Sequence, residues 1–351
     1  MTTTPTQTLF EQLANWAGFR RLQESAPWLP NPLICWGIVV FVTDLFILQI
    51  AKEFAGYTAT FITNPLWTLQ PIFGLVGSVV VVFLHNRYDT VLEEIDVSAR
   101  TSDPKTFDTL VPQSVRATLY VILAVYSLWQ FFINIGMDTV TGVGGLAELI
   151  GVGIVLPLGY GVIFSEFLAT YIGILLVFPR KIRYSDFELN FLDPEGLGGL
   201  RPAGELMKTA YYFIVLGLVG YLGVFYGHGL IAPLTGSPYP THGVVQNVLF
   251  TSVWVLAVVT MVYGLAQIHL FMKRKKRKEL ARLDRELRDT VDNPFDASAF
   301  DIRDKDAYED VKLRIKYVTK TQEYPTTFSM WVQILLGVVL PKALQVVVTS
   351  L

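Results

Sequence analysis

Apolar residues in this chain gather into long, uninterrupted runs that are separated by polar segments. A bilayer core about 30 Å thick is crossed by a helix of about 20 residues. The runs do not alternate, and a backbone in lipid must satisfy its own hydrogen bonds, so the pattern predicts helices rather than strands. Seven runs have the necessary length: Leu33–Ile50, Leu66–Leu84, Ala117–Gly136, Leu149–Phe178, Met207–Tyr226, Val244–Met272 and Thr326–Val348.

Composition and charge turn this pattern into a topology. Hydrophobic residues make up 52% of the chain and charged residues 17%, which is typical of a multi-pass membrane protein. Of the 28 lysines and arginines, all except Lys52 and Lys342 fall on one side if every run crosses the membrane. The positive-inside rule then predicts a cytoplasmic N-terminus and an outside C-terminus. We therefore expect an all-α integral protein of the cell (plasma) membrane with seven transmembrane helices.

The same pattern divides the chain into four parts. Residues 1–32 form a cytoplasmic segment, in which the apolar face of Leu9, Leu13 and Trp16 predicts a short helix on the membrane surface. Residues 33–272 hold spans one to six, residues 273–325 a cytoplasmic helical hairpin, and residues 326–351 the seventh span. No cleavable signal peptide is expected, because the first 32 residues lack an early apolar run.

Two apolar stripes at helical spacing predict the hairpin. The sixth span is expected to continue as a helix beyond the basic run Lys273–Lys278. If the stripes face each other, the two helices form an antiparallel hairpin; the alternative is two separate surface helices. The basic run either marks the end of the span or binds anionic lipid. The stripes are Leu280, Leu283, Leu287 and Val291, then Tyr308, Val311, Ile315 and Val318.

The fourth run is too long for one straight crossing. Leu149–Phe178 would measure about 45 Å as a single helix. Its first half contains four glycines and Pro157, which predicts a kink or a closely packed region; a re-entrant segment is the alternative.

No constellation of residues indicates an enzyme. The histidines His85, His228, His242 and His269 are scattered, and Cys35 stands alone, so we expect no metal, no cofactor and no disulfide within the chain. Nucleophile-elbow, P-loop and CxxC motifs are absent. The glycine-rich stretch Asp193–Gly204 is either a compact turn or a ligand contact.

Ionisable and polar residues inside the runs need partners, because an isolated charge in lipid is costly. Asp44 lies about 18 Å into the first span and Lys342 about 24 Å into the seventh, so their depths predict an ion pair; lining of an aqueous path is the alternative. Glu166 is expected to be neutral or paired. Gln130 and Asn134 share a helical face, where we expect hydrogen bonds between helices, with cavity lining as the alternative.

The combination of features resembles a known family. These features are seven spans with an inside N-terminus, a long fourth span, a sixth span prolonged into the cytoplasm, and a last helix divided at Tyr324–Pro325. They are similar to those of the insect odorant and gustatory receptor-like superfamily of seven-helix ligand-gated cation channels. That family carries Thr, then Tyr or Phe, apolar residues and Gln in its last helix. Here Thr327–Gln333 reads TFSMWVQ, one residue shorter than the usual form.

The resemblance implies a homotetramer in which the hairpins form a central anchor and the last helices line one pore. Gln333, Gly337 and Lys342 would then approach the pore, where a lysine would disfavour cations. A ligand pocket would lie among spans two to six on the outer side, walled by Phe132, Tyr221, Phe225 and Trp254. The implied partners are membrane lipid, copies of the same chain and a small molecule, with no nucleic acid.

Three hypotheses follow for function. The first is a channel-like or ligand-responsive oligomer, and the second is a membrane scaffold or assembly protein that does not conduct. A membrane enzyme acting on lipid is the third; it would need a cleft that brings Asp193, Glu195 or His85 within hydrogen-bond distance of one another.

Overall fold

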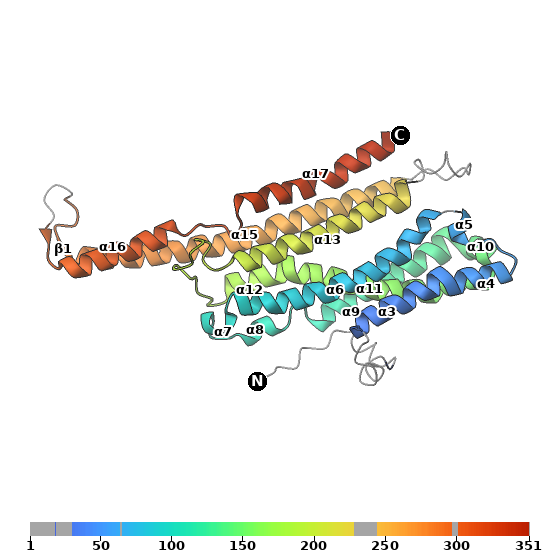
Figure 1. Cartoon of the computed structure of the whole chain (residues 1–351), viewed down its shortest axis with the longest axis horizontal. Helices are drawn as coiled ribbons and strands as arrows, with labels where there is room; N and C mark the ends of the chain where they lie inside the picture. Colours follow the sequence, from blue (N-terminus) through green and yellow to red (C-terminus); the bar gives the residue numbers. More distant parts are fainter. Residues whose placement is uncertain (1–17, 19–29, 64, 228–243, 297–300, 351) are drawn as a thin grey trace.

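A computed structural model describes residues 18, 30–63, 65–227, 244–296 and 301–350 of the chain, and these residues are overwhelmingly helical (Figure 1). The segments η1, η3, η4 and η5 are π-helical, and η2 is a 3-10 helix. In chain order the elements are α3 (Pro32–Val42), η1 (Thr43–Ile47), α4 (Leu48–Phe54), α5 (Thr60–Thr63), η2 (Pro65–Thr68), α6 (Leu69–Glu94), α7 (Val97–Arg100), α8 (Lys105–Asp108), α9 (Gln113–Leu128), η3 (Trp129–Gly136), α10 (Met137–Ile150), η4 (Gly151–Tyr160), α11 (Gly161–Ile172), η5 (Gly173–Val177), α12 (Phe178–Tyr184), α13 (Arg201–Tyr226), α15 (Val244–Asp289), β1 (Val291–Asp292), β2 (Asp301–Ile302), α16 (Lys305–Lys320) and α17 (Phe328–Ser350).

Among the described residues, six helical stretches are long and apolar enough to cross a membrane. Their outward side chains are often large and apolar; Val125, Val259 and Leu335 are 60%, 56% and 65% exposed. Water would disfavour so much exposed apolar surface, whereas lipid does not. The chain is therefore a multi-pass membrane protein whose described part is predominantly helical. The stretches are Pro32–Phe54, Pro65–Glu94, Lys105–Tyr184, Arg201–Tyr226, Asn247–Asp289 and Ser329–Val347.

The third stretch folds back on itself. Its 80 residues would make a helix about 120 Å long, several times the thickness of a bilayer. The backbone departs from helical geometry at Gly136, where φ is +93°, and again at Gly144 and Gly145. As a result the stretch forms a hairpin, in which α9 is one arm and η4 with α11 is the other, and the two arms pack together. The first turn coincides with the end predicted for the third apolar run.

The long fourth run is helical throughout and closely packed, with the π-helical segments η4 and η5 on either side of the α-helix α11. η4 contains Pro157, which removes a backbone donor from the helix. A Cβ on Gly159 would lie 2.9 Å from Val40 of α3, and one on Gly153 would lie 3.3 Å from Phe132 of η3. These glycines let neighbouring helices approach closely, as the sequence predicts.

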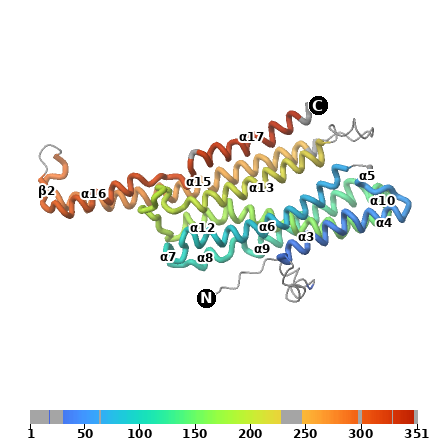
Figure 2. The backbone as a smooth tube through the Cα atoms, viewed as in Figure 1, coloured from blue at the N-terminus to red at the C-terminus, as the bar shows by residue number. Residues whose placement is uncertain are grey.

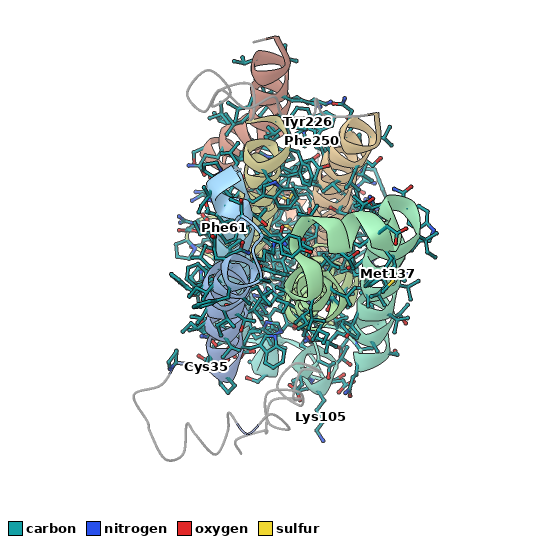
Figure 3. All side chains as sticks on the ribbon, turned by 90° about the vertical axis from the view of Figure 1, so that its right-hand side faces the viewer. Cys35, Phe61, Lys105, Met137, Tyr226 and Phe250 are labelled. Atoms are coloured by element: carbon teal, nitrogen blue, oxygen red, sulfur yellow. The ribbon has the colours of Figure 1, made fainter. Side chains whose placement is uncertain are left out.

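The remaining helices complete a bundle with a projecting stem. α3 packs on α6, α6 on α11 and α13, and α13 on α15 and α17. α15 leaves the bundle without a break and pairs with α16, and we call these two arms, residues 273–320, the stem (Figure 2). Viewed from the end opposite the stem, side chains fill most of the space between the helices (Figure 3).

The stem is held together by the two predicted stripes. Leu283 of α15 and Val311 and Val318 of α16 are buried against each other, and Leu280, Leu287 and Ile315 pack beside them. β1 and β2 pair antiparallel near the tip. Asp304 caps α16 by accepting a hydrogen bond from the Ala307 amide at 3.0 Å. The sequence prediction of a hairpin is confirmed, whereas the surface helix predicted within residues 1–32 lies outside the described residues.

Candidate functional site

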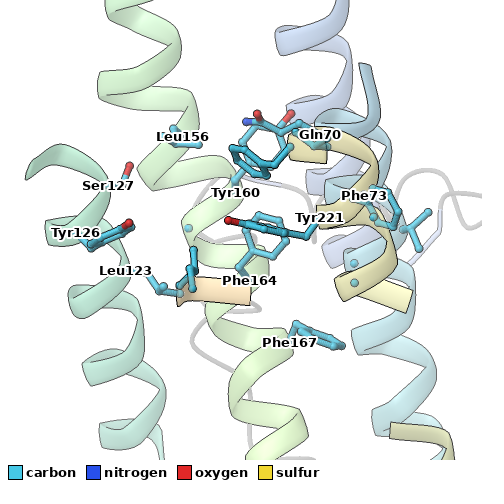
Figure 4. A pocket seen from close by; sticks show the side chains of 18 of the residues that line it. Gln70, Phe73, Leu123, Tyr126, Ser127, Leu156, Tyr160, Phe164, Phe167 and Tyr221 are labelled. Atoms are coloured by element: carbon cyan, nitrogen blue, oxygen red, sulfur yellow. The ribbon is translucent and has the colours of Figure 1, made fainter. Parts of the chain in front are cut away.

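The helices of the bundle border a partly open cavity of about 820 Å³ (Figure 4). It lies toward the end of the bundle opposite the stem. Its wall consists of 25 residues. One of them is Trp67 of η2, and the others belong to α6, α9, η3, η4, α11, α13 and α15. Ten of the 25 are aromatic and none is Asp, Glu, Lys, Arg or His. A concave, largely apolar space of this size is typical of a site for a small organic molecule.

Glycines and aromatic rings shape the wall. A Cβ on Gly220 of α13 would lie 2.2 Å from the Phe73 ring, so this glycine allows α6 and α13 to pack closely. A Cβ on Gly217, one turn earlier on α13, would meet no atom within 4 Å, because Gly217 faces open space. Two wall segments, η3 and η4, are π-helical, and π-helical turns occur frequently at functional sites. The cavity is thus bounded by irregular helix on one side and close packing on the other.

A few polar groups lie among the apolar wall residues. Gln70, Tyr126, Ser127 and Gln130 line the cavity near the end opposite the stem. The hydroxyl of Ser127 is buried and has no hydrogen-bond partner in the described part of the chain. Buried polar atoms are normally paired, and an orphan atom on a cavity wall is suited to a hydrogen bond with a ligand.

Two of the four aromatic residues predicted for a ligand pocket line this cavity. Tyr221 and Phe225 of α13 are on the wall, with ring centroids 4.5 Å apart. Phe132 instead packs against Gly153 of η4, and the indole of Trp254 donates a hydrogen bond to the Val338 carbonyl of α17 at 2.9 Å. Neither side chain lines this cavity, because the rotation of each helix, which the family resemblance does not give, turns both toward other neighbours.

Sequence reasoning missed other wall residues. Phe73, Tyr160, Phe164 and Phe213 all face the cavity. A signal was present: Gly217 and Gly220 lie three residues apart on one face of α13, and glycines on a helix face invite large partners from a neighbouring helix.

The predicted ion pair between Asp44 and Lys342 is wrong. Asp44 accepts a hydrogen bond from the Tyr160 hydroxyl at 2.6 Å. The Lys342 amine donates to Thr251 at 3.1 Å and to Gln345 at 2.7 Å. Equal depth along the two helices predicted the pair. Asp44 lies in η1, directly after α3, and α3 packs on α6, whereas α17 packs on α13 on another side of the bundle (Figure 1).

The residues predicted to line a pore do not share one face of α17. Gly337 is buried against Tyr211, since a Cβ there would lie 2.8 Å from the ring. Lys342 also turns into the protomer, with its amine 5.6 Å from the centroid of the Phe250 ring. Only Gln333 of the three is exposed, and it accepts a hydrogen bond from Lys208 at 3.1 Å. Within the single chain, α17 uses the side that carries Gly337 and Lys342 to pack on neighbouring helices, so pore lining by these residues stays a prediction.

Glu166 is paired, as predicted. Its carboxylate lies 2.5 Å from the Arg116 guanidinium, and both side chains are buried. Arg116 also lies 3.3 Å from Nε2 of His85, whose Nδ1 lies 3.0 Å from the Val81 carbonyl. A carbonyl can only accept, so Nδ1 carries the proton and Nε2 accepts from Arg116. This cluster joins α6, α9 and α11.

Other polar side chains in the spans make hydrogen bonds either within one helical segment or between helices. Asn134 donates to Gln130 at 3.2 Å within η3, so the hydrogen bond predicted between helices is instead made within one segment. Asn247 of α15 accepts hydrogen bonds from Tyr226 of α13 at 2.5 Å and from Gln345 of α17 at 3.1 Å. These bonds connect the last helix to the bundle.

The glycine-rich stretch Asp193–Gly204 is a compact turn. Gly196, Gly198 and Gly199 have φ between +65° and +69°, and the amides of Leu197 and Gly199 donate to the Asp193 carboxylate. The amide groups that would hold an anion are thus occupied by the chain itself. Glu195 pairs with Arg201, and His85 contacts Arg116.

Basic side chains fasten this turn and the stem to the bundle. Arg100 donates to the carbonyls of Glu188, Ile95, Gly198 and Gly199, and its burial lowers the pKa of the guanidinium to about 10. The group is still charged at neutral pH.

Three residues of the run Lys273–Lys278 act in the same way. Arg274 donates to the Arg183 carbonyl at 2.8 Å, and Lys275 to the Asp186 carbonyl at 3.3 Å. Lys276 donates to the carbonyl of Thr321 at 2.6 Å. Half of the basic run is therefore engaged with backbone carbonyls.

The joint between the stem and α17 is also held closely. His269 of α15 stacks on Tyr324 with ring centroids 4.1 Å apart, and its Nδ1 lies 2.9 Å from the Glu323 carbonyl. A Cβ on Gly204 would lie 2.4 Å from the Pro325 carbonyl, so α13 also contacts this joint.

No group of three or more His, Cys, Asp or Glu side chains suited to a metal ion occurs among the described residues, and His228 and His242 lie outside them. Comparisons with protein-family models, with curated proteins and with solved structures find no match for this chain.

Proposed function

We propose that this protein is a ligand-responsive membrane protein that binds a small apolar molecule in the cavity between α6, α9, η4, α11, α13 and α15. The observation that carries the proposal is the cavity itself, with about 820 Å³ of space and ten aromatic wall residues. Its wall also holds the buried hydroxyl of Ser127, which has no hydrogen-bond partner among the residues that the structure describes. A purely structural bundle would gain dispersion energy by filling such a space.

The topology that we propose has seven crossings. The stretch Lys105–Tyr184 supplies two antiparallel apolar arms, and each of the other five stretches supplies one. The positive-inside rule then places the N-terminus and the stem in the cytoplasm and the cavity in the outer half of the membrane. Fusing a reporter to each terminus tests this arrangement, which predicts that the two reporters reach opposite compartments.

The response is proposed to pass from the cavity to α17. Tyr221 on the cavity wall stacks on Phe250 of α15, with ring centroids 6.1 Å apart. The Lys342 amine of α17 lies 5.6 Å from the same Phe250 ring. A ligand that displaces Tyr221 therefore alters the packing beneath α17. In a channel-like oligomer, with four copies if the family resemblance holds, α17 would be the helix that opens or closes the pore.

Ligand binding is the first test. The purified protein in lipid nanodiscs is screened against uncharged alcohols, esters and terpenes by the quenching of its tryptophan fluorescence. Leu123→Trp places an indole in the cavity, and we expect it to weaken saturable binding at least tenfold, a change of about 1.4 kcal/mol or more. Val121→Trp is the matched control, because Val121 lies on the same helix, is 55% exposed and is not on the cavity wall.

A scaffold that does not conduct is the second candidate. It is favoured by the exposed face of α17, where Leu335, Leu336 and Val339 are 65%, 63% and 54% exposed and Gly337 and Lys342 are turned inward. Ion flux from proteoliposomes, measured with and without a bound ligand, separates the two candidates. Ligand-dependent flux supports the channel-like oligomer. Saturable binding without flux supports a ligand-responsive scaffold, and the absence of binding to the cavity refutes both ligand-responsive forms.

A further inference from the structure

The polar groups of the cavity are not evenly distributed. Gln70 is the second residue of α6, and Val80 on the same helix lies about 15 Å further along toward the stem. On α13, Tyr221 is near the end opposite the stem and Phe213 lies about 12 Å deeper. The deep part of the wall is therefore hydrocarbon and aromatic ring. Amide and hydroxyl groups lie in the shallow part, and they include the Ser127 hydroxyl, for which the described residues supply no hydrogen-bond partner.

The cavity is partly open, and the packing of its walls shows on which side. α9 packs on α11, α11 on α6, α6 on α13 and α13 on α15, so the wall helices form an open arc. No extensive packing joins the ends of this arc, α9 and α15, within the described part of the chain. Nearer the stem α15 rests on η5 and α12, where Tyr171 bonds to Thr260 at 2.9 Å, which closes that end.

The two helices that border the opening have apolar outer surfaces. On α9, Ile122 and Val125 are 57% and 60% exposed, and on α15, Val255 and Val259 are 45% and 56% exposed. Side chains of this kind are stable when they face the hydrocarbon of a bilayer. An opening between α9 and α15 therefore connects the cavity to lipid rather than to water.

We infer that the ligand is an uncharged amphiphile, with one hydrogen-bonding head group and a hydrocarbon body, and that it reaches the cavity from the bilayer between α9 and α15. The inference rests on the proposed function and specifies its ligand. The hydrocarbon body occupies the deep part between Val80 and Phe213, and the head group bonds to Ser127 in the shallow part. A charged head group is excluded, because no ionisable Asp, Glu, Lys, Arg or His side chain on the wall would compensate it.

Photolabelling of the purified protein in phosphatidylcholine vesicles tests the ligand class. One probe is 1-decanol carrying a diazirine, and the other is the corresponding decyl sulfate, each present at the same mole fraction in the bilayer. We expect saturable labelling of peptides from α9 and α13 by the alcohol and at least tenfold weaker labelling by the sulfate. Ser127→Ala should weaken labelling by the alcohol about three- to tenfold, and should leave labelling by a diazirine-bearing decane unchanged.

The route is tested by the rate of labelling. Leu249 is the wall residue contributed by α15, and Leu249→Trp narrows the opening. We expect this change to slow labelling from the bilayer about tenfold. Leu256→Trp, two turns further along the same helix at a residue that is 55% exposed and off the wall, should not change the rate.

The outcomes separate the inference from the proposed function. If no probe labels the cavity walls saturably, the proposed function fails. If labelling is saturable but the sulfate labels as well as the alcohol, the ligand class is wrong while the proposed function stands. If Leu249→Trp and Leu256→Trp label at the same rate as the unchanged protein, the ligand reaches the cavity by another route.

Discussion

Removing the carboxylate of Glu166 should destabilise the bundle more than any exposed ion pair would. The Arg116 and Glu166 side chains are 8% and 3% exposed, and their charged atoms are 2.5 Å apart. Glu166→Gln keeps the shape of the side chain but leaves the guanidinium buried without its counter-charge. Because the remaining partner, His85, is neutral, it cannot replace that charge. Loss of one partner of a buried pair typically costs about 3–5 kcal/mol, and we expect a loss in this range.

The assay is reversible unfolding in mixed micelles, followed by helicity as SDS is added. A double variant, Arg116→Met with Glu166→Leu, removes both charges and should recover most of the stability, since apolar replacement of a buried pair is often close to neutral. Glu279→Gln is the control. Glu279 pairs with Arg282 on the exposed surface of the stem, and its loss should cost less than about 1 kcal/mol. The reasoning is refuted if Glu166→Gln behaves like this control, or if the two losses in the double variant simply add.

Three further predictions follow from the same structure. Gly220→Ala should cost about 1–3 kcal/mol of unfolding free energy, because its methyl group meets the Phe73 ring. Gly217 faces open space, so Gly217→Ala should be neutral or stabilising by up to about 1 kcal/mol. Equal effects of the two substitutions in the same unfolding assay would contradict this prediction. The losses caused by Asp44→Asn and Lys342→Met should add in a double-mutant cycle, because the two residues bond to different helices, and a coupling above about 0.5 kcal/mol would restore the ion pair. Hydrogen bonds from Ser102 and Thr101 lower the pKa of Asp186 to about 2. The contribution of Asp186 to stability should therefore be present above about pH 4 and disappear as the pH falls from about 4 to about 2. An unfolding midpoint that falls equally with pH in Asp186→Asn would argue against this contribution.

The parts of the fold that the sequence predicts are those set by local pattern. Apolar runs mark the helices, and the period of Leu280, Leu283 and Leu287 marks the stem, because each depends only on residues close together in the chain. Gly136 ends the third run in the sequence and breaks the helix in the structure for the same reason: its backbone adopts a positive φ that other residues avoid.

The arrangement of helices around one another is less accessible from sequence. Depth along a helix can be counted, but the neighbour of each helix and its rotation depend on contacts from distant segments. For this reason depth alone predicts an ion pair between Asp44 and Lys342, whereas in the structure Asp44 accepts a hydrogen bond from Tyr160. The π-helical turns of η3 and η4 shift side chains away from the 3.6-residue period, so Phe132 does not reach the cavity while Tyr160 does.

Basic residues near the base of the stem have two roles, one in the orientation of the chain in the membrane and one in the packing of the fold. In the topology that we propose, Arg100, Arg274, Lys275 and Lys276 belong to the charge bias that directs membrane insertion, and each also donates to backbone carbonyls. Transplanting these cations to the opposite loops, the usual way to invert a polytopic protein, would strip those carbonyls of their donors. A chain inserted in the opposite orientation would therefore lack the hydrogen bonds that hold the stem and the adjoining loops to the bundle. A change of orientation during evolution would require new contacts at these positions.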